Sequence, residues 1–151
     1  VSVEAGQIRK GGYIMIKGKP CKVRDVSVSK TGKHGHAKCK FTAVDIFTGN
    51  TCEELCPSSH SIDIPIVTKN DWMVQGIQDE VYVLLMNDDG DMREDLQLPN
   101  QTYKTDDDNN VSLLLKDYND MLDNGHNIDI FCTVISAVGQ EKITEVRKKD
   151  V

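Results

Sequence analysis

Long apolar runs are absent from this sequence, and proline and aromatic residues are scarce. Its 151 residues include 4 Pro, 1 Trp, 4 Tyr and 3 Phe. No stretch supplies the roughly 20 apolar residues of a transmembrane helix, and residues 1–12 lack the pattern of a secretory signal. The proportions of hydrophobic (38%) and charged (28%) residues are typical of a folded chain rather than a disordered one. We therefore expect a folded protein that does not bind membranes.

Cysteine occurs in a pattern that does not suit a disulfide framework. The 5 cysteines are an odd number and most lie inside apolar runs: Cys21, Cys39, Cys52, Cys56 and Cys132. Buried, reduced thiols of this kind are typical of a cytoplasmic protein. Cys52 and Cys56 have no second matching pair, so we interpret them as structural thiols rather than zinc ligands. We expect neither a metal nor a cofactor.

The net charge of -6 conceals two halves of opposite sign. Residues 1–67 carry 10 Lys and Arg against 6 Asp and Glu, whereas residues 68–151 carry 8 against 18. A locally basic surface attracts polyanions even when the whole chain is acidic. The asymmetry predicts two domains with different partners, at 1–67 and 68–151.

Short alternating segments predict strands throughout the first half. Apolar residues recur with a period of two, and turn residues separate the segments. The predicted strands span residues 13–17, 21–29, 37–46, 51–56 and 61–67. Several short strands without a helical period indicate a small β-barrel.

The second half predicts a linker at 68–71, a sheet and one late helix. Predicted strands cover residues 72–78, 81–87, 92–98, 128–138 and 142–146. Apolar residues at three- and four-residue spacing predict a helix over 111–122. We interpret the polar tract before it, including Asp106–Asp108, as a solvated acidic loop whose contacts the sequence does not indicate. Five strands with one inserted helix suit an OB-type barrel, although other small barrels fit the same count.

One segment concentrates positive charge in this acidic chain. Between Val26 and Val44 there are four lysines and two histidines but no acidic residue. At its centre Gly32 and Gly35 bracket Lys33, and glycine permits the backbone of a tight apex. A lysine held there would project outward on a flexible stem. An ordinary solvated turn would explain the same composition, and the two alternatives stay open at this point.

Known site chemistries fit this segment poorly. A phosphate-binding P-loop needs Ser or Thr after Gly-Lys, but His34 follows Lys33. His34 and His36 lack a suitably spaced third metal ligand. The chain also shows no nucleophile–base pair and no paired catalytic carboxylates, so we do not expect an enzyme.

Residues 29–38 resemble the hypusine loop of the eukaryotic translation initiation factor 5A family, relatives of bacterial elongation factor P. The string is Ser-Lys-Thr-Gly-Lys-His-Gly-His-Ala-Lys. Further segments resemble the same family in the same order, at residues 18–22, 45–49, 56–58, 76–79 and 93–99. The resemblance covers nearly the whole chain and weakens at 101–110 and over the last residues.

The resemblance implies a mainly β fold of two small barrels. An SH3-like barrel at 1–67 would carry the loop, and an OB-fold domain with one inserted helix would follow at 68–151. Lys33 would be the residue modified to hypusine. Deoxyhypusine synthase would transfer an aminobutyl group from spermidine to it, and deoxyhypusine hydroxylase would then hydroxylate the product. Gly32, His34, Gly35 and His36 would shape the loop and dock these enzymes.

The resemblance further implies a non-enzymatic translation factor that binds the ribosome beside peptidyl-tRNA. Modified Lys33 would contact the tRNA and promote peptide-bond formation at stalled sequences such as polyproline, in elongation and also in termination. Lys30 and Lys38 would contact RNA phosphates. The alternative is a generic RNA-binding module without a modified lysine. Trp72 would either stack on a base or, as we expect, pack at the interdomain boundary or in the core.

Overall fold

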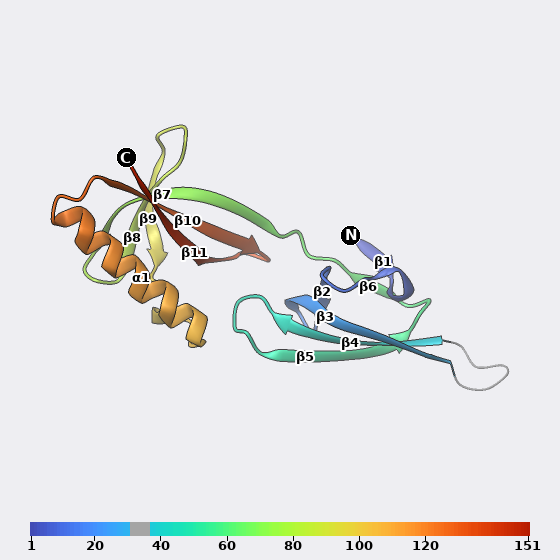
Figure 1. Cartoon of the computed structure of the whole chain (residues 1–151). Coiled ribbons are helices and arrows are strands. Elements are labelled where there is room, and N and C mark those ends of the chain that lie inside the picture. The colour runs from blue at the N-terminus through green and yellow to red at the C-terminus, as the bar shows by residue number, and fades with distance from the viewer. Residues whose placement is uncertain (31–36) are drawn as a thin grey trace. The chain divides into compact units, whose positions relative to one another are not determined.

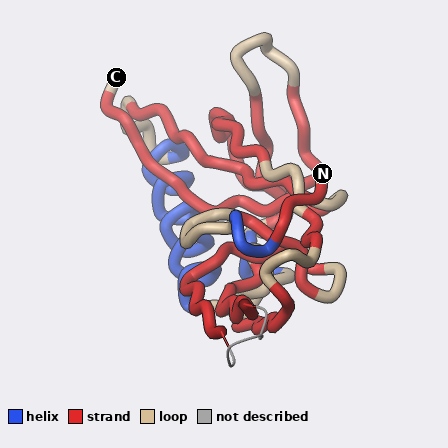
Figure 2. Tube along the Cα trace, turned by 90° about the vertical axis from the view of Figure 1, so that its right-hand side faces the viewer, coloured by secondary structure: helices blue, strands red, loops and turns tan. Residues whose placement is uncertain are grey.

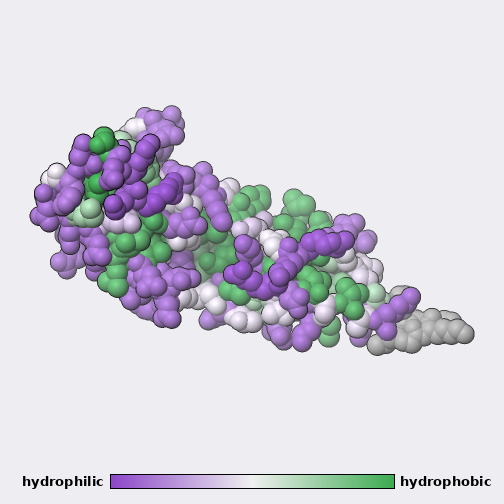
Figure 3. Space-filling model, viewed as in Figure 1, coloured by the Kyte–Doolittle hydropathy of each residue, from purple (hydrophilic) through white to green (hydrophobic). Residues whose placement is uncertain are grey.

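The computed structural model describes residues 1–30 and 37–151. The chain forms two compact units, Val1–Val67 and Thr68–Val151. Strands make up most of both units, and the described residues contain a single α-helix (Figures 1 and 2). The prediction of a mainly β chain with one helix is confirmed. On the face shown in Figure 3, hydrophilic residues cover most of the surface and apolar patches interrupt them.

A four-stranded antiparallel sheet in the order β2-β3-β4-β5 dominates the first unit, and β1 pairs with β6 beside it. Its elements are β1 (Ser2–Glu4), η1 (Ala5–Gln7), β2 (Tyr13–Ile16), β3 (Lys19–Lys30), β4 (Ala37–Asp45), β5 (Thr51–Pro57) and β6 (Ser61–Asp63). Lys17 and Gly18 connect β2 to β3 with φ of 51° and 78°. Two successive positive φ angles are typical of the type I′ hairpin turn, whose twist matches the strands.

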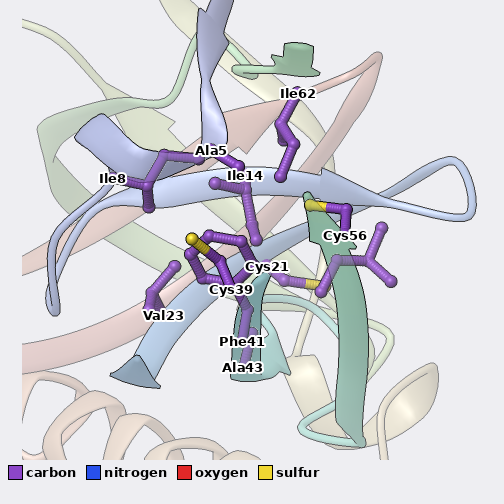
Figure 4. Packing of buried hydrophobic residues seen from close by; sticks show 11 residues of the cluster. Ala5, Ile8, Ile14, Cys21, Val23, Cys39, Phe41, Ala43, Cys56 and Ile62 are labelled. Atoms are coloured by element: carbon purple, nitrogen blue, oxygen red, sulfur yellow. The ribbon is translucent and has the colours of Figure 1, made fainter. Parts of the chain in front are cut away.

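The core of the first unit lies on one face of this sheet. Alternate residues of β4, Cys39, Phe41 and Ala43, are completely buried, as period-two alternation requires (Figure 4). Burying a side chain such as Phe41 contributes about 1.5–3 kcal/mol. All five cysteines are free and four are buried, with Cys52 half-buried. The predicted burial of the thiols is therefore confirmed at four positions.

The second unit is a five-stranded antiparallel sheet in the order β11-β10-β7-β8-β9, with the helix packed against it. Its elements are β7 (Thr68–Gln78), β8 (Tyr82–Met86), β9 (Met92–Gln97), η2 (Pro99–Gln101), α1 (Asp106–Asp123), β10 (Ile128–Ala137) and β11 (Gln140–Asp150). Leu115 of α1 and the inward residues of the sheet form one buried cluster.

Three predicted boundaries are wrong, two of them because polar residues also occur within strands. The expected linker at 68–71 is the start of β7, where Asp71 pairs with Thr133 and Thr68 with Ser136 of β10. The strand expected over 61–67 ends at Asp63. Likewise β11 extends beyond the expected 142–146, because its charged end pairs with the first residues of β10.

The expected acidic loop at Asp106–Asp108 is the first turn of α1, so this prediction is also wrong. Thr105 caps the helix: its hydroxyl accepts from the Asp108 amide at 3.1 Å, and the Asp108 carboxylate accepts from the Thr105 amide at 3.1 Å. This reciprocal capping box satisfies two amides that the helix leaves unpaired, and carboxylates favour the positive end of the helix dipole. The capping interactions therefore stabilise a helix in a segment whose polar composition suggested a loop.

The same Asp108 ties the helix to the sheet. Asp108 is 2% exposed, and its carboxylate forms an ion pair with the ammonium of Lys142 on β11, a residue that is 9% exposed. The Lys142 ammonium also lies 4.7 Å from the ring centroid of Tyr103. A buried charge is costly unless its partner is present, so this contact fixes the position of α1 on the barrel.

A second ion pair links the two strands at the ends of the sheet order. Arg93 of β9 donates to both carboxylate oxygens of Glu141 on β11, at 3.0 and 2.7 Å, and to Asp95 at 2.8 and 2.7 Å. Hydrogen bonds from Arg93 lower the pKa of both carboxyl groups from their ordinary values of 3.8 and 4.5. The contact draws β9 and β11 together, which favours a barrel-like closure.

We predict that Asp108→Ala destabilises the second unit by about 3 kcal/mol or more, because it removes the partner of a buried lysine as well as a cap. Asp107→Ala, which changes the exposed neighbour in the same helical turn, should cost less than about 0.5 kcal/mol. Urea unfolding followed by the fluorescence of Trp72, the chain's only tryptophan, measures both. Equal losses for the two variants would contradict the structural role of Asp108.

The Arg93 contacts predict an acid-sensitive second unit. Asp95 and Glu141 have folded-state pKa values below the unfolded ones, so they contribute stability above about pH 5 that is lost as pH falls through the folded values. Arg93→Met should cost about 1–2 kcal/mol at pH 7. It should also flatten the decline in the free energy of unfolding between about pH 5 and 3. An unchanged pH dependence in the variant would refute this assignment.

Candidate functional site

The predicted functional loop joins β3 to β4. The described ends of these strands are in register, with Lys30 opposite Ala37 and Ser29 opposite Lys38. Residues 31–36 connect them (Figure 1). The predicted site residues Gly32, Lys33, His34, Gly35 and His36 therefore lie outside the described residues. The strand predicted over 21–29 extends one residue farther at its end, so Lys30 is the last residue of β3.

The hairpin formed by β3 and β4 continues beyond the hydrophobic core. Val23 of β3 is 1% exposed, but past the bulge near Arg24 the strand emerges, and Val28 is 62% exposed. On the other side, Cys39 and Phe41 anchor β4 in the core. The amide of Ser58 donates to the carbonyl of Ala37 at 2.9 Å and holds the start of β4 from the β5 side. Backbone pairing rather than apolar packing thus supports the end of β3.

Lys30 and Lys38 stand at this end of the hairpin on neighbouring strands, and both are exposed. Within residues 1–30 and 37–151, no ion pair involves either lysine. Farther along β4, Lys40 lies 4.0 Å from Glu53, but both side chains are more than half exposed, so that pair is weak. The end of the hairpin therefore carries positive charge that can attract phosphate.

The thiols of the first unit support packing rather than reactivity. Burial raises the pKa of Cys21 to about 12 and also raises that of Cys56. Cys39 lies directly opposite Cys56 in the sheet. A thiol is nucleophilic and binds metal as the thiolate, which burial disfavours here. The interpretation of these residues as structural thiols agrees with this environment.

Trp72 lies on β7 in the second unit and is half-buried. It packs against the buried cluster of that unit, and the Arg93 guanidinium lies 5.4 Å from its ring centroid. The expectation that Trp72 packs in the core is confirmed for the part of the side chain that is buried.

Among the described residues, no helix has the length and apolar character needed to cross a membrane.

Two family models together span almost the whole chain. Residues 1–60 match "Translation initiation factor 5A-like, N-terminal", and residues 66–147 match "Eukaryotic elongation factor 5A hypusine, DNA-binding OB fold". The chain belongs to the translation initiation factor 5A family. The two models confirm the predicted fold class, in which an SH3-like barrel precedes an OB-fold domain.

Individual relatives agree with this assignment. The chain is 46% identical over 144 residues to eukaryotic translation initiation factor 5A-4 of Solanum tuberosum, which covers 95% of this chain and 83% of the relative. Factor 5A-1 of Arabidopsis thaliana is also 46% identical over 144 residues, with 95% and 84% covered.

Solved structures show the same similarity. A translation initiation factor 5A family protein from Naegleria fowleri has a TM-score of 0.84 and 44% identity, covering 97% of both chains. Factor 5A from Methanococcus jannaschii has a TM-score of 0.68 and 29% identity, covering 97% of this chain and 94% of its own. The similarity includes both units, so membership of this translation-factor family does not depend on the loop alone.

Proposed function

We propose that Lys33 is modified to hypusine and that the protein binds the ribosome beside peptidyl-tRNA. There the modified side chain promotes peptide-bond formation at stalled sequences such as polyproline, in elongation and also in termination. The observation that carries the proposal is membership of the 5A family over both units, including a domain whose family description names hypusine. Lys33 stands at the centre of the segment that resembles the hypusine loop.

The physical advantage of the modification is reach. Hypusine is longer than lysine and carries a second basic nitrogen, so it extends positive charge farther from the backbone. Lys30 and Lys38, paired across the base of the loop, add positive charge on the same hairpin. In this proposal they contact RNA phosphates while Lys33 reaches the acceptor end of the tRNA. The factor then acts by positioning the substrate, which lowers the entropic cost of reaction without a nucleophile from the protein.

The proposal makes the chain a substrate of enzymes rather than an enzyme. Deoxyhypusine synthase transfers the aminobutyl group of spermidine to Lys33, and deoxyhypusine hydroxylase adds the hydroxyl group. Gly32 and Gly35 leave room for a close approach, and His34 and His36 complete the surface that these enzymes recognise. Because the proposed modifying enzymes and the ribosome act in the cytoplasm, the proposal also locates the protein there. The exposed continuation of β3 past the core supports access to the loop.

A generic RNA-binding module is the second candidate, favoured by the exposed Lys30 and Lys38 and the basic first unit. In that case no single lysine would dominate. Several phosphate contacts would share the affinity, and each would contribute to its salt dependence. The two functions therefore differ in how sharply activity depends on Lys33.

We predict that Lys33→Arg abolishes most of the protein's activity on a polyproline reporter in a translation extract, because arginine keeps the charge but cannot be hypusinated. Lys30→Arg and Lys38→Arg are the matched controls and should retain activity within about twofold, since they preserve the charge that phosphate contacts need. A Lys33→Arg variant with full activity would contradict the proposal.

Mass spectrometry of the peptide around Lys33, from protein made in its native cells, tests the modification itself. We expect a mass increase that corresponds to one aminobutyl group and one oxygen. If the lysine is entirely unmodified, the generic RNA-binding function replaces the proposed one.

A further inference from the structure

The helix α1 packs on the sheet of the second unit (Figure 1), and its outward face carries two leucines that the core leaves exposed. Leu113 is 50% exposed and Leu114 is 37% exposed, whereas the next residue, Leu115, is completely buried. Within the described residues, neither exposed leucine packs against the buried cluster of this unit. A single exposed leucine is ordinary, so the surroundings of this pair decide its meaning.

Helical periodicity places exposed aspartates on the same face, on both sides of the leucines. Seven residues make about two helical turns, so side chains seven apart point the same way. Asp106 lies seven residues before Leu113, and Asp120 lies seven residues after it. Asp117, four residues after Leu113 and three after Leu114, is their neighbour on the helix surface. This surface, the α1 face, comprises Asp106, Leu113, Leu114, Asp117 and Asp120, all of which are exposed.

The aspartates in the second half of α1 do not serve the stability of the helix. Carboxylates are favourable at the start of a helix, which accounts for Asp106, but unfavourable near its end, and the last turn of α1 has no basic residue. Asp117, Asp120 and Asp123 also recur every three residues, a spacing at which like charges repel. None of the three forms an ion pair within the described ranges. The charge here therefore opposes the preference of the helix itself.

The charge of the α1 face selects the class of its occupant. Carboxylates repel phosphate, so the face does not suit a nucleic acid or an anionic membrane. Among the residues that the structure describes, no group of three or more His, Cys, Asp or Glu side chains is placed to hold a metal ion. The same face of a second copy would bring charge of the same sign. Cationic protein side chains complement the aspartates, and apolar ones complement the leucines.

We propose that the α1 face docks a Lys/Arg-rich segment of a partner protein. An apolar side chain of the segment packs on the two leucines, and cations on both sides of it pair with the aspartates. An apolar centre with a charged rim is the usual arrangement of a protein interface. Asp106 and Asp120 are 14 residues apart, which is about 21 Å along the helix axis. An extended segment of about six residues covers that length.

A synthetic peptide of this chemistry tests the proposal on the full chain. The peptide has eight residues, with two leucines at its centre, two lysines at each end and a fluorescent label. Fluorescence anisotropy should show saturable binding that weakens as salt is raised, because exposed ion pairs are screened. Replacing the peptide's leucines with serines keeps its charge and should weaken binding at least about fivefold. Replacing its lysines with glutamates should abolish binding.

Charge variants of the protein separate the α1 face from other acidic surfaces. Asp117→Asn with Asp120→Asn should weaken peptide binding about threefold to tenfold. The matched control, Asp88→Asn with Asp89→Asn, removes the same charge from the exposed turn between β8 and β9. It should change the affinity less than about twofold. An equal loss in the two variants would mean that the peptide responds only to net charge.

Stability measurements show that these effects do not arise from unfolding. Asp117→Asn with Asp120→Asn should raise the urea midpoint or leave it unchanged, because it removes carboxylates that repel each other near the negative end of the helix dipole. Leu113→Gln with Leu114→Gln should weaken peptide binding at least about fivefold. Its urea midpoint should stay close to that of the wild type, since glutamine is also a good helix former.

Several outcomes would overturn the proposal. One is the absence of peptide binding, and another is binding that the variants of the α1 face leave unchanged. Self-association of the chain that these variants abolish would identify a second copy as the occupant instead. Lys33→Arg should leave the peptide titration unchanged, because the α1 face does not depend on the modified lysine. The proposal for Lys33 and the proposal for α1 therefore fail or hold separately.

Discussion

The backbone pairing of β3 with β4 is the constraint on which presentation of the loop depends. Inside the core, Val23 and Phe41 stabilise these strands by burial, but beyond Val26 the side chains of β3 are exposed. There the hydrogen-bonded ladder maintains the register that sets Lys30 opposite Ala37. A one-residue shift in register would turn each side chain to the other face. Packing in the core therefore fixes the register of the β3–β4 hydrogen bonds, and this register fixes which strand residues flank residues 31–36.

The second unit has more acidic than basic residues, and its few basic side chains have different roles. Lys142 pairs with buried Asp108 and joins the helix to the sheet, whereas Arg93 pairs with Glu141 and links the edge strands. Arg147 also pairs with a carboxylate, that of Asp71. Lys148 and Lys149, which follow Arg147, form no ion pair within the described ranges. Net charge alone does not reveal this division.

How much the sequence predicts depends on whether a signal is local. Period-two alternation predicts the strands, and the string around Lys33 is specific enough to indicate the family. The helix start was missed although Thr105 and Asp108 have the spacing of a capping box, because the intervening polar residues resemble a loop. The contact of Arg147 with the ring of Phe131 in the second unit was not predictable in the same way. Phe131, Met73 and Arg147 meet only through register between strands that are distant in the chain.

Local charge rather than net charge therefore determines where an acidic protein can attract a polyanion. The first unit has more Lys and Arg than Asp and Glu, and its exposed hairpin lysines offer phosphate contacts with little rigidity. The second unit is acidic, but Asp71 holds Arg147 beside the ring of Phe131, so part of its positive charge is fixed in place rather than flexible. Flexible, exposed cations supply salt-dependent attraction for phosphate, whereas a cation paired with a carboxylate has much of its charge offset.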